Sequence, residues 1–246
     1  MPEPSGSDEW PARSLLGTLP PLERAHLLGL GTEVRFNTGD VLLRQGDVEE
    51  HVVLLLSGFA KVTATVENGE TSLLAVRAAG DTVGEMAALT GAPRSATVTA
   101  CGPLIARVAQ SPGLRLLLER RPVVSMALTG MVADRLRWAN RRRLDFRGYP
   151  AKVRLARLLV ELADSYGFAR ADGVVIGCRL IQAELATLVG AAETTIQKVL
   201  RELRDEGLLE TGYRSTTIRD LPRLERLADL ARDGRSHPHR RASEGR

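Results

Sequence analysis

Residues Leu180 to Arg204 read LIQAELATLVGAAETTIQKVLRELR and have the spacing of two helices joined by a sharp turn. Ala186 is small enough to let the two helices approach closely, and Gly190 has the backbone freedom that a tight turn requires. The shared core comes from apolar residues at helical spacing, namely Leu185, Val189, Ile196, Val199 and Leu200. This order is typical of a helix-turn-helix, in which the second helix lies on DNA.

The flanking sequence favours a winged helix over an ordinary helical hairpin, which has the same periodicity. Gly207 can end the second helix, and LLETGYRSTTIRD then gives two short apolar or β-branched runs around Thr211 and Tyr213, as in a β-hairpin. Upstream, Pro150 can begin the helix AKVRLARLLVELADSYG, and GVVIGCRL is typical of a strand that pairs with the wing. We therefore expect a winged helix-turn-helix DNA-binding domain over residues 150–222.

Length and composition indicate a protein with two cores. The chain has 246 residues, of which 43% are hydrophobic, enough to bury two cores joined by a connector. Its apolar stretches, such as HVVLLLSGFA, are too short to span a bilayer, and MPEPSGSDEW lacks the basic and apolar regions of a signal peptide. We therefore expect a cytoplasmic protein with no membrane partner.

The reactive residues argue against an enzyme and against a metal site, so no catalytic or metal-ligating residue is assigned. Cys101 and Cys178 are the only cysteines; they are too few for an all-cysteine iron–sulfur cluster within one chain and have no metal-ligand spacing. We expect both to be small core residues. The chain has no nucleophile motif, and no His/Cys/Asp cluster forms around its four histidines, which are His26, His51, His237 and His239.

Positive charge is concentrated in two segments, although the net charge is only +4. Residues 135–157 hold nine Arg or Lys against one acid, Asp145, and residues 231–246 hold five Arg against two acids. This asymmetry beside the predicted winged helix favours a polyanionic partner such as double-stranded DNA. The run from Arg141 to Arg143 also fits an ordinary solvated helix face. The tail 231–246 is rich in Arg, Gly and Ser and is expected to be disordered.

The N-terminal half has short apolar runs separated by glycine-containing turns, which predicts a compact antiparallel β-roll over residues 15–120. The runs are GDVLLRQGD, HVVLLLSGFAKVTATVENGE, TSLLAVRAAGD and SATVTA. Turn chemistry, with no ligand contact, explains the three Gly-Asp pairs at 39–40, 46–47 and 80–81.

Helical periodicity follows the β-rich half, over residues 121–146. Its apolar stripe repeats every four positions and needs a partner helix, the residues being Val124, Leu128, Val132 and Leu136.

A segment of different chemistry, GEMAALTGAPRSATVTA, begins at Gly84 within the β-rich half. Gly84 allows close backbone approach, Glu85 offers a carboxylate to sugar hydroxyls, and the residues from Met86 onward can form a helical turn whose N–H groups point toward a phosphate. Arg94 and Ser95 bring a guanidinium and a hydroxyl to the same anion. Together these groups can hold a ribose-phosphate ring. A Glu and an Arg at this spacing also form ordinary surface or buried ion pairs.

With this segment in view, the chain resembles the Crp/Fnr family of bacterial transcription regulators over residues 15–230. The specific motif is the cassette GE…PRSA. The resemblance implies an α+β protein with a cyclic-nucleotide-binding β-roll, a long dimerisation helix and a C-terminal winged helix-turn-helix. These are the elements, in the same order, that the patterns above predict.

The resemblance also implies a ligand and partners. Gly84 and Glu85 would face the ribose, Arg94 and Ser95 would hold the cyclic phosphate, and neighbouring backbone amides such as that of Met86 would assist. The implied effector is a cyclic nucleotide, with cyclic AMP as the leading candidate and no metal. The implied partners are double-stranded DNA and a second copy of the chain, with RNA polymerase as a further candidate.

The base end of the site departs from the family pattern. Family members that bind cyclic AMP present a Thr-Ser pair from the dimerisation helix, whereas this chain has Ala139 and Asn140 there. Ala139 has no hydrogen-bonding side chain, and Asn140 can either read a purine edge or lie in the helix seam as a polar register residue. Ala75 also replaces a serine that contacts the nucleotide from a roll strand. Cyclic AMP, cyclic GMP, another nucleotide and no ligand therefore stay open.

The recognition helix departs from the family as well, because a frequent signature is SRETV and this chain has AAETTI from Ala191 to Ile196. Glu193 takes the place of an arginine that reads guanine, so that pairing is lost, and the carboxylate instead either suits a cytosine amino group or repels phosphate. Lys198 and Arg201 are expected to contact backbone phosphates. The predicted DNA-contacting residues are Glu193, Thr194, Thr195, Gln197, Lys198 and Arg201.

These features predict ligand-linked DNA binding by a homodimer, with two recognition helices about 34 Å apart on a near-palindromic site. A ligand between the roll and the dimerisation helix would reorient the winged helices through the connector DFRGYPAK, in which Gly148 is either a hinge or a helix stop. The alternative is an effector-independent or architectural DNA-binding protein that keeps the roll only as a scaffold.

Overall fold

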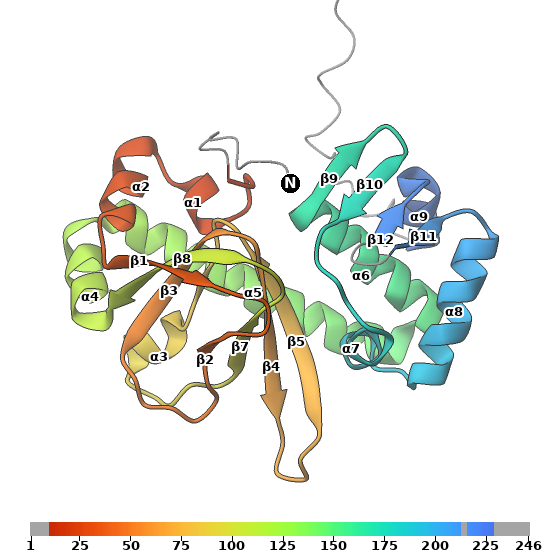
Figure 1. Ribbon diagram of the computed structural model, residues 1–246, viewed down its shortest axis with the longest axis horizontal. Helices are drawn as coiled ribbons and strands as arrows, with labels where there is room; N and C mark the ends of the chain where they lie inside the picture. The colour runs from red at the N-terminus through yellow and green to blue at the C-terminus, as the bar shows by residue number, and fades with distance from the viewer. Residues whose placement is uncertain (1–9, 213–215, 229–246) are drawn as a thin grey trace, which may run out of the picture.

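The computed structural model describes residues 10–212 and 216–228, which form two domains connected by one long helix (Figure 1). This helix, α5 (Pro122–Gly148), passes behind the N-terminal β-roll and reaches the C-terminal domain. The architecture confirms the predicted α+β fold. Tyr213 of the predicted wing turn and the basic tail 231–246 lie outside the described residues.

The roll consists of two antiparallel four-stranded sheets, with strand orders β1-β8-β3-β6 and β2-β7-β4-β5. Small and branched apolar residues, including Val53, Leu55, Ala60 and Val98, are buried in one cluster shared by both sheets. This cluster follows from the alternating apolar positions of the predicted strands. The strands are β1 (Thr32–Phe36), β2 (Val41–Leu43), β3 (His51–Ser57), β4 (Phe59–Thr65), β5 (Thr71–Ala78), β6 (Thr82–Val83), β7 (Thr97–Ala100) and β8 (Leu104–Gln110).

Helices cover one side of the roll and form a second apolar cluster with it. The shorter helices of this domain are α1 (Leu15–Thr18), α2 (Pro21–Leu28), α3 (Glu85–Thr90) and α4 (Ser111–Arg120). Val124 and Leu128 of α5 are buried in this cluster beside Val52 and Leu54 of β3. Val124 and Leu128, the first two members of the stripe, are thus covered within the chain by helices α1, α2 and α4 and by β3. Leu136, by contrast, is 61% exposed.

The C-terminal domain is a winged helix. Its wing strand β12 pairs with β10, with Val174 opposite Ile218, as the sequence predicted. The strand β9 was not predicted; it pairs with β10 and completes the sheet order β11-β12-β10-β9. The elements are α6 (Ala151–Tyr166), β9 (Gly167–Arg170), β10 (Gly173–Ile176), α7 (Gln182–Val189), α8 (Glu193–Asp205), β11 (Leu209–Thr211), β12 (Thr216–Ile218) and α9 (Leu221–Leu227).

The two domains are docked through β4, β5 and α7, which lies beside β5 in Figure 1. Leu73 and Val76 of β5 belong to the buried core of the C-terminal domain. Two polar contacts accompany this apolar junction. The Lys61 ammonium lies 2.6 Å from Glu184 Oε1, and the Leu73 N–H donates to Thr187 Oγ1 at 3.0 Å. The helix-turn-helix is therefore held directly against the roll.

Candidate ligand site and nucleic-acid interface

The helix-turn-helix is formed by α7, Gly190 and α8. Gly190 adopts the left-handed conformation, with φ of +65°, which a residue with a side chain adopts only at a cost. A Cβ on Gly190 would also lie 2.9 Å from the Phe146 ring of α5, so the turn passes close to the end of the long helix. One side of α8 is buried in the domain core by Ile196, Val199, Leu200 and Leu203.

The opposite side of α8 is open and lies at the outer edge of the domain, away from the roll (Figure 1). Each DNA-contacting residue predicted from the sequence is exposed there: Glu193, Thr194, Thr195, Gln197, Lys198 and Arg201. Within residues 10–212 and 216–228, no side-chain hydrogen bond or ion pair engages any of these six. α8 therefore presents hydroxyl, amide and charged groups of the kinds that contact bases and phosphates.

Several cations near α8 and α5 are held by groups of the protein itself. Lys152 lies 2.6 Å from Glu206 Oε1 and 3.3 Å from Glu202 Oε2, and its hydrogen bond to Glu206 raises the pKa of Lys152. In the basic run of α5, the Arg142 guanidinium lies 4.5 Å above the Trp138 ring, and burial lowers the pKa of Arg142 to about 10. Part of the predicted basic surface is therefore structural.

The cassette surrounds the N-terminus of α3. Gly84 precedes this helix with φ of +82°, and a Cβ there would lie 2.6 Å from Arg94 Nη1. Glu85 and Arg94 are both buried. The Arg94 guanidinium donates to the backbone oxygen of Gly84 at 2.8 Å and to that of His51. Its bonds thus join the cassette to β3.

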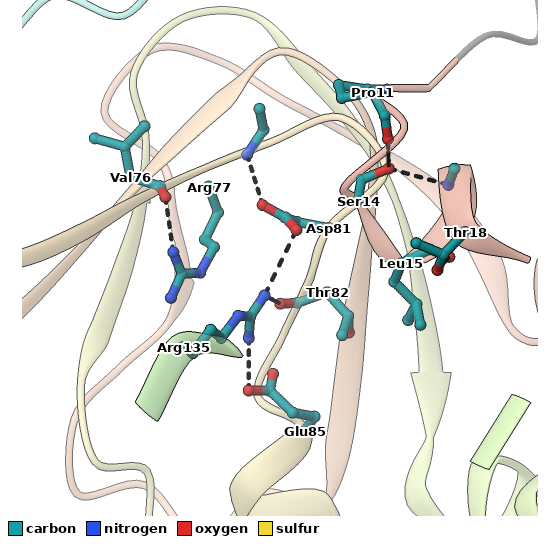
Figure 2. A network of polar contacts seen from close by, with 12 residues as sticks. Pro11, Ser14, Leu15, Thr18, Val76, Arg77, Asp81, Thr82, Glu85 and Arg135 are labelled. Carbon is teal, nitrogen blue, oxygen red and sulfur yellow. Dashed lines mark hydrogen bonds and ion pairs between the residues drawn. The ribbon is translucent and has the colours of Figure 1, made fainter. Parts of the chain in front are cut away.

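Arg135 of α5 was not singled out from the sequence, yet it binds the Glu85 carboxylate of the cassette (Figure 2). Its Nη1 lies 2.7 Å from Glu85 Oε1, its Nη2 donates to the Thr82 backbone oxygen at 2.8 Å, and the same nitrogen is 3.8 Å from Asp81 Oδ1. Burial lowers the pKa of Arg135, while the carboxylates of Glu85 and Asp81 oppose that shift. The sequence does hold a signal for Arg135. It precedes Ala139, one of the two helix positions expected at the base end of the ligand site, by one helical turn.

The cluster contains buried polar atoms without partners in the described part of the chain. They are Glu85 Oε2 and Arg94 Nε. A buried polar atom left unpaired costs about 1–3 kcal/mol, which a polar ligand can recover. Gly84, Glu85 and Arg94 are thus brought together, whereas Met86 and Ser95 are exposed beside them.

Asn140 is exposed on α5, five residues beyond Arg135. No contact among the described residues joins its side chain to the cassette. Its place on the long helix therefore suits either of the two roles that the sequence left open.

A chain of contacts leads from the cassette to the C-terminal domain. Tyr166, the last residue of α6, donates its hydroxyl to the Val76 backbone oxygen at 3.0 Å and lies 3.5 Å from Asp81 Oδ2. Asp81 also faces Arg135, the partner of Glu85. Burial and the Asp81 carboxylate raise the pKa of Tyr166 to about 12. Polar contacts thus connect the expected ligand residue Glu85 with the end of α6, the first helix of the C-terminal domain.

In the described ranges, no three His, Cys, Asp or Glu side chains are grouped so that they could hold a metal ion. None of the helices there has the length and apolar character needed to cross a bilayer. His26 Nε2 lies 2.9 Å from Arg121 Nη2 at the surface of the roll. His237 and His239 lie outside the described residues.

Comparisons with known proteins identify both domains. Residues 33–121 match the family Cyclic nucleotide-binding domain, and residues 153–227 match the family Crp-like helix-turn-helix domain. The CRP-like cAMP-activated global transcriptional regulator of Mycobacterium tuberculosis is 28% identical over 195 residues, covering 79% of this chain and 87% of the relative. The cyclic AMP receptor protein of Thermus thermophilus is 28% identical over 191 residues, covering 77% of this chain and 85% of the relative.

Solved structures share the same fold. A CRP/FNR-family transcriptional regulator from Thermus thermophilus has a TM-score of 0.65 at 26% identity, covering 80% of this chain and 98% of that one. FixK2 from Bradyrhizobium japonicum has a TM-score of 0.69 at 21% identity, covering 80% and 97%. The matched regulators confirm the prediction of a regulator and not an enzyme. With both domain matches in this order along the chain, the protein belongs to the Crp/Fnr family of transcription regulators.

Proposed function

We propose that this protein is a homodimeric, sequence-specific DNA-binding regulator whose affinity for DNA is gated by a cyclic nucleotide, with cyclic AMP as the leading candidate. The single observation that carries the proposal is the buried cluster of Glu85, Arg94 and Arg135, in which Glu85 Oε2 and Arg94 Nε have no protein partner among the described residues. In this proposal, residues 15–120 bind the ligand, residues 121–146 dimerise and residues 150–222 bind DNA.

The chemistry of the cassette suits a ribose joined to a cyclic phosphate. Glu85 can accept from a ribose hydroxyl at its unpartnered oxygen while it keeps Arg135 on the other oxygen. The fork of Arg94 and the exposed hydroxyl of Ser95 can bind the phosphate, with backbone N–H groups from Met86 onward adding donors. For Arg94, this exchanges bonds to neutral backbone oxygens for a charge-assisted pair.

The outer surface of α5 supports dimerisation. Met126 is 73% exposed and Leu144 is 72% exposed, as two large apolar residues on one long helix. Met126, Ala133 and Asn140 follow one another at intervals of seven residues, the repeat that places side chains in a seam between two helices. A second copy of α5 would cover these residues and place the two α8 helices about 34 Å apart on DNA.

The contact chain from Glu85 through Arg135 and Asp81 to Tyr166 suggests how the ligand acts. A ligand that binds Glu85 and stabilises one position of Arg135 also changes the contact between Asp81 and Tyr166. Because Tyr166 ends α6, this change alters the position of α6. The ligand shifts the population only by its differential affinity for the two domain arrangements, about 1–3 kcal/mol in typical cases.

An effector-independent regulator is the second candidate, and one observation favours it. The guanidiniums of Arg94 and Arg135 already have protein acceptors, so neither is left as an unpaired charge that requires a ligand. In either case we propose that the protein acts in the cytoplasm, where it reaches DNA, with RNA polymerase as a further partner.

Calorimetric titration with cyclic AMP and then cyclic GMP tests the proposal. We expect micromolar binding by the wild-type protein. Ser95→Ala, which changes an exposed hydroxyl, should weaken that binding without altering stability, and Arg94→Ala should abolish it. Circular dichroism establishes that the variants remain folded. If a folded protein that still binds DNA releases or absorbs no heat with either nucleotide, nucleotide gating is overturned. The protein would then be the effector-independent regulator.

A further inference from the structure

The two cysteines of the chain face each other across the junction between the domains. Cys101 follows β7 in the roll and Cys178 follows β10 in the winged helix, yet their Sγ atoms lie 3.5 Å apart. They are the only cysteines in 246 residues and are separated by 77 positions. We propose that Cys101 and Cys178 form an oxidation site, at which a hydroperoxide converts the two thiols into an interdomain disulfide.

The position of the two side chains supports direct bonding. A disulfide is about 2.05 Å long, so a side-chain movement of about 1.5 Å joins the sulfurs without separating the domains. The backbone on the roll side is anchored, because the Cys101 N–H donates to the Phe59 backbone oxygen at 2.9 Å. The nearby pair of Lys61 and Glu184 holds the same junction together.

The two thiols have unequal environments, which suits one attacking and one resolving cysteine. The Cys178 thiol donates a hydrogen bond to Cys101 Sγ, and this bond lowers the pKa of Cys101, to which the Lys61 ammonium also contributes. The same hydrogen bond, together with burial, raises the pKa of Cys178. Cys101 is half-buried and Cys178 is buried. Cys101 is therefore the thiolate that meets the oxidant first.

The reaction proceeds in two balanced steps with hydrogen peroxide as the oxidant. The Cys101 thiolate attacks one peroxide oxygen, so that an S–O bond forms, the O–O bond breaks, and the departing hydroxide takes up a proton to give water and a sulfenic acid. Cys178 then attacks the Cys101 sulfur, the S–S bond forms, the S–O bond breaks, and the second water carries away the thiol proton. Two thiols lose two electrons in total, and one peroxide becomes two waters.

The disulfide would fix the DNA-binding domain against the roll. The existing contacts across the junction, such as Leu73 with Thr187 and Tyr166 with Val76, are non-covalent and can open. A covalent bond between Cys101 and Cys178 would prevent the two domains from separating at this junction. This consequence rests on the proposed function, because it makes the oxidised protein unable to undergo the domain movement by which a nucleotide would act.

The test uses the full-length reduced protein, treated with increasing hydrogen peroxide and then with an alkylating agent. We expect a product lighter than the reduced protein by two hydrogen atoms, with both thiols protected from alkylation and one peptide pair joined through Cys101 and Cys178. Cys178→Ser should stop at a Cys101 sulfenic acid that a dione reagent traps. Cys101→Ser should leave Cys178 reduced and alkylated after unfolding, which also shows that its burial protects it.

Three results would overturn the oxidation site: both thiols unchanged, a disulfide that joins two copies of the chain, or a Cys101 sulfinic acid beside a free Cys178. Circular dichroism of the reduced, oxidised and variant proteins shows whether each remains folded. Where a serine variant does not fold, Cys101→Ala or Cys178→Ala replaces it, and the expected oxidation products are the same.

A second measurement compares nucleotide-dependent binding to a DNA site selected from a random pool. Reduced protein should show a response of about 5- to 150-fold, and the disulfide form should lose it, with recovery after dithiothreitol treatment. A disulfide that forms while the reduced protein ignores both nucleotides would contradict nucleotide gating and leave the oxidation site standing. A nucleotide response of equal size in both forms would contradict the proposed locking of the domains.

Discussion

Arg135 of α5 binds Glu85 of the cassette through Nη1 and Oε1, 2.7 Å apart, although the two residues are 50 positions apart in the chain. Figure 2 shows how the same guanidinium also reaches the Thr82 backbone oxygen and the Asp81 carboxylate. Both members of the pair are removed from water, with side chains 19% and 7% exposed. The ion pair therefore ties the predicted dimerisation helix to the predicted ligand site.

Arg135→Gln should destabilise the protein by about 3–5 kcal/mol, because it leaves the buried Glu85 carboxylate without its cation. The matched control is Arg137→Gln on the same helix, which breaks an exposed pair with Asp134 and should cost less than about 1 kcal/mol. Urea unfolding measures both. Adding Glu85→Gln to Arg135→Gln should recover part of the loss, and equal costs for Arg135→Gln and Arg137→Gln would contradict the assignment.

Tyr166→Phe should weaken the coupling between nucleotide and DNA binding while changing stability by about 0.5–1.5 kcal/mol. The phenol is the contact that joins α6 to Asp81 and to the Val76 backbone oxygen. Fluorescence anisotropy of labelled DNA, with and without the nucleotide, gives the coupling as a ratio of affinities. A variant that keeps the wild-type ratio would show that the domain movement does not depend on this hydroxyl.

Alkaline pH should destabilise the wild-type protein through Tyr166. Burial raises the pKa of Tyr166 to about 12, whereas an unfolded tyrosine has a pKa of about 10. Between these values the unfolded chain releases a proton that the folded chain retains, so the free energy of unfolding falls by about 1.4 kcal/mol per pH unit. Below pH of about 10 both states keep the proton and the effect vanishes.

Urea unfolding of the wild type and of Tyr166→Phe over that pH range measures this loss. The advantage of the wild type over the variant, about 0.5–1.5 kcal/mol below pH of about 10, should shrink as the pH rises and change sign before pH of about 12, because only the wild type has the titrating group. A difference that is constant with pH would contradict the shifted pKa.

Short-range patterns predicted the helix-turn-helix and the cassette, because their defining residues are close in sequence. The small residue Ala186 and the turn at Gly190 lie within one 25-residue stretch, and Gly84 and Arg94 are ten positions apart. Local rules of helix spacing and turn geometry suffice for such features. The sequence-based assignments of ligand and DNA contacts on these elements remain predictions.

Contacts between distant elements were not predictable in the same way. Periodicity shows that α5 has an apolar stripe, but not that the chain's own roll covers Val124 and Leu128. Cys101 and Cys178 were each expected to be core residues, while their 3.5 Å approach depends on how the two domains dock. Arg135 was missed for the same reason, since its partner is 50 positions away.

Gly84→Ala should reduce both stability and nucleotide binding, whereas Gly91→Ala should reduce stability alone. The two glycines flank α3 with φ of +82° and +71°, so each substitution costs about 1–2 kcal/mol for a left-handed backbone. Only Gly84 is crowded, because its Cβ would meet Arg94 Nη1 at 2.6 Å, while Gly91 has nothing within 4 Å. Calorimetry with cyclic AMP should therefore show weakened binding for the first variant, and equal binding by both would contradict the role of Arg94.

Glu193→Ala and Lys198→Ala should affect DNA binding differently, because one side chain is expected to read a base and the other a phosphate. Glu193 is the first residue of α8, and its loss should change the preferred base at one position of each half-site by about 1–3 kcal/mol. Lys198→Ala should weaken binding to all DNA sequences evenly. It should also reduce the slope of log affinity against log salt concentration by about 1. Lys152→Ala is the matched control, since Glu202 and Glu206 already hold that ammonium.

Selection from a random DNA pool, followed by anisotropy titrations at several salt concentrations, separates these effects. Unchanged sequence preference in Glu193→Ala would show that this residue is not a reader. A salt slope in Lys152→Ala that falls as far as in Lys198→Ala would show that the phosphate contacts extend beyond the exposed side of α8, toward the N-terminus of α6.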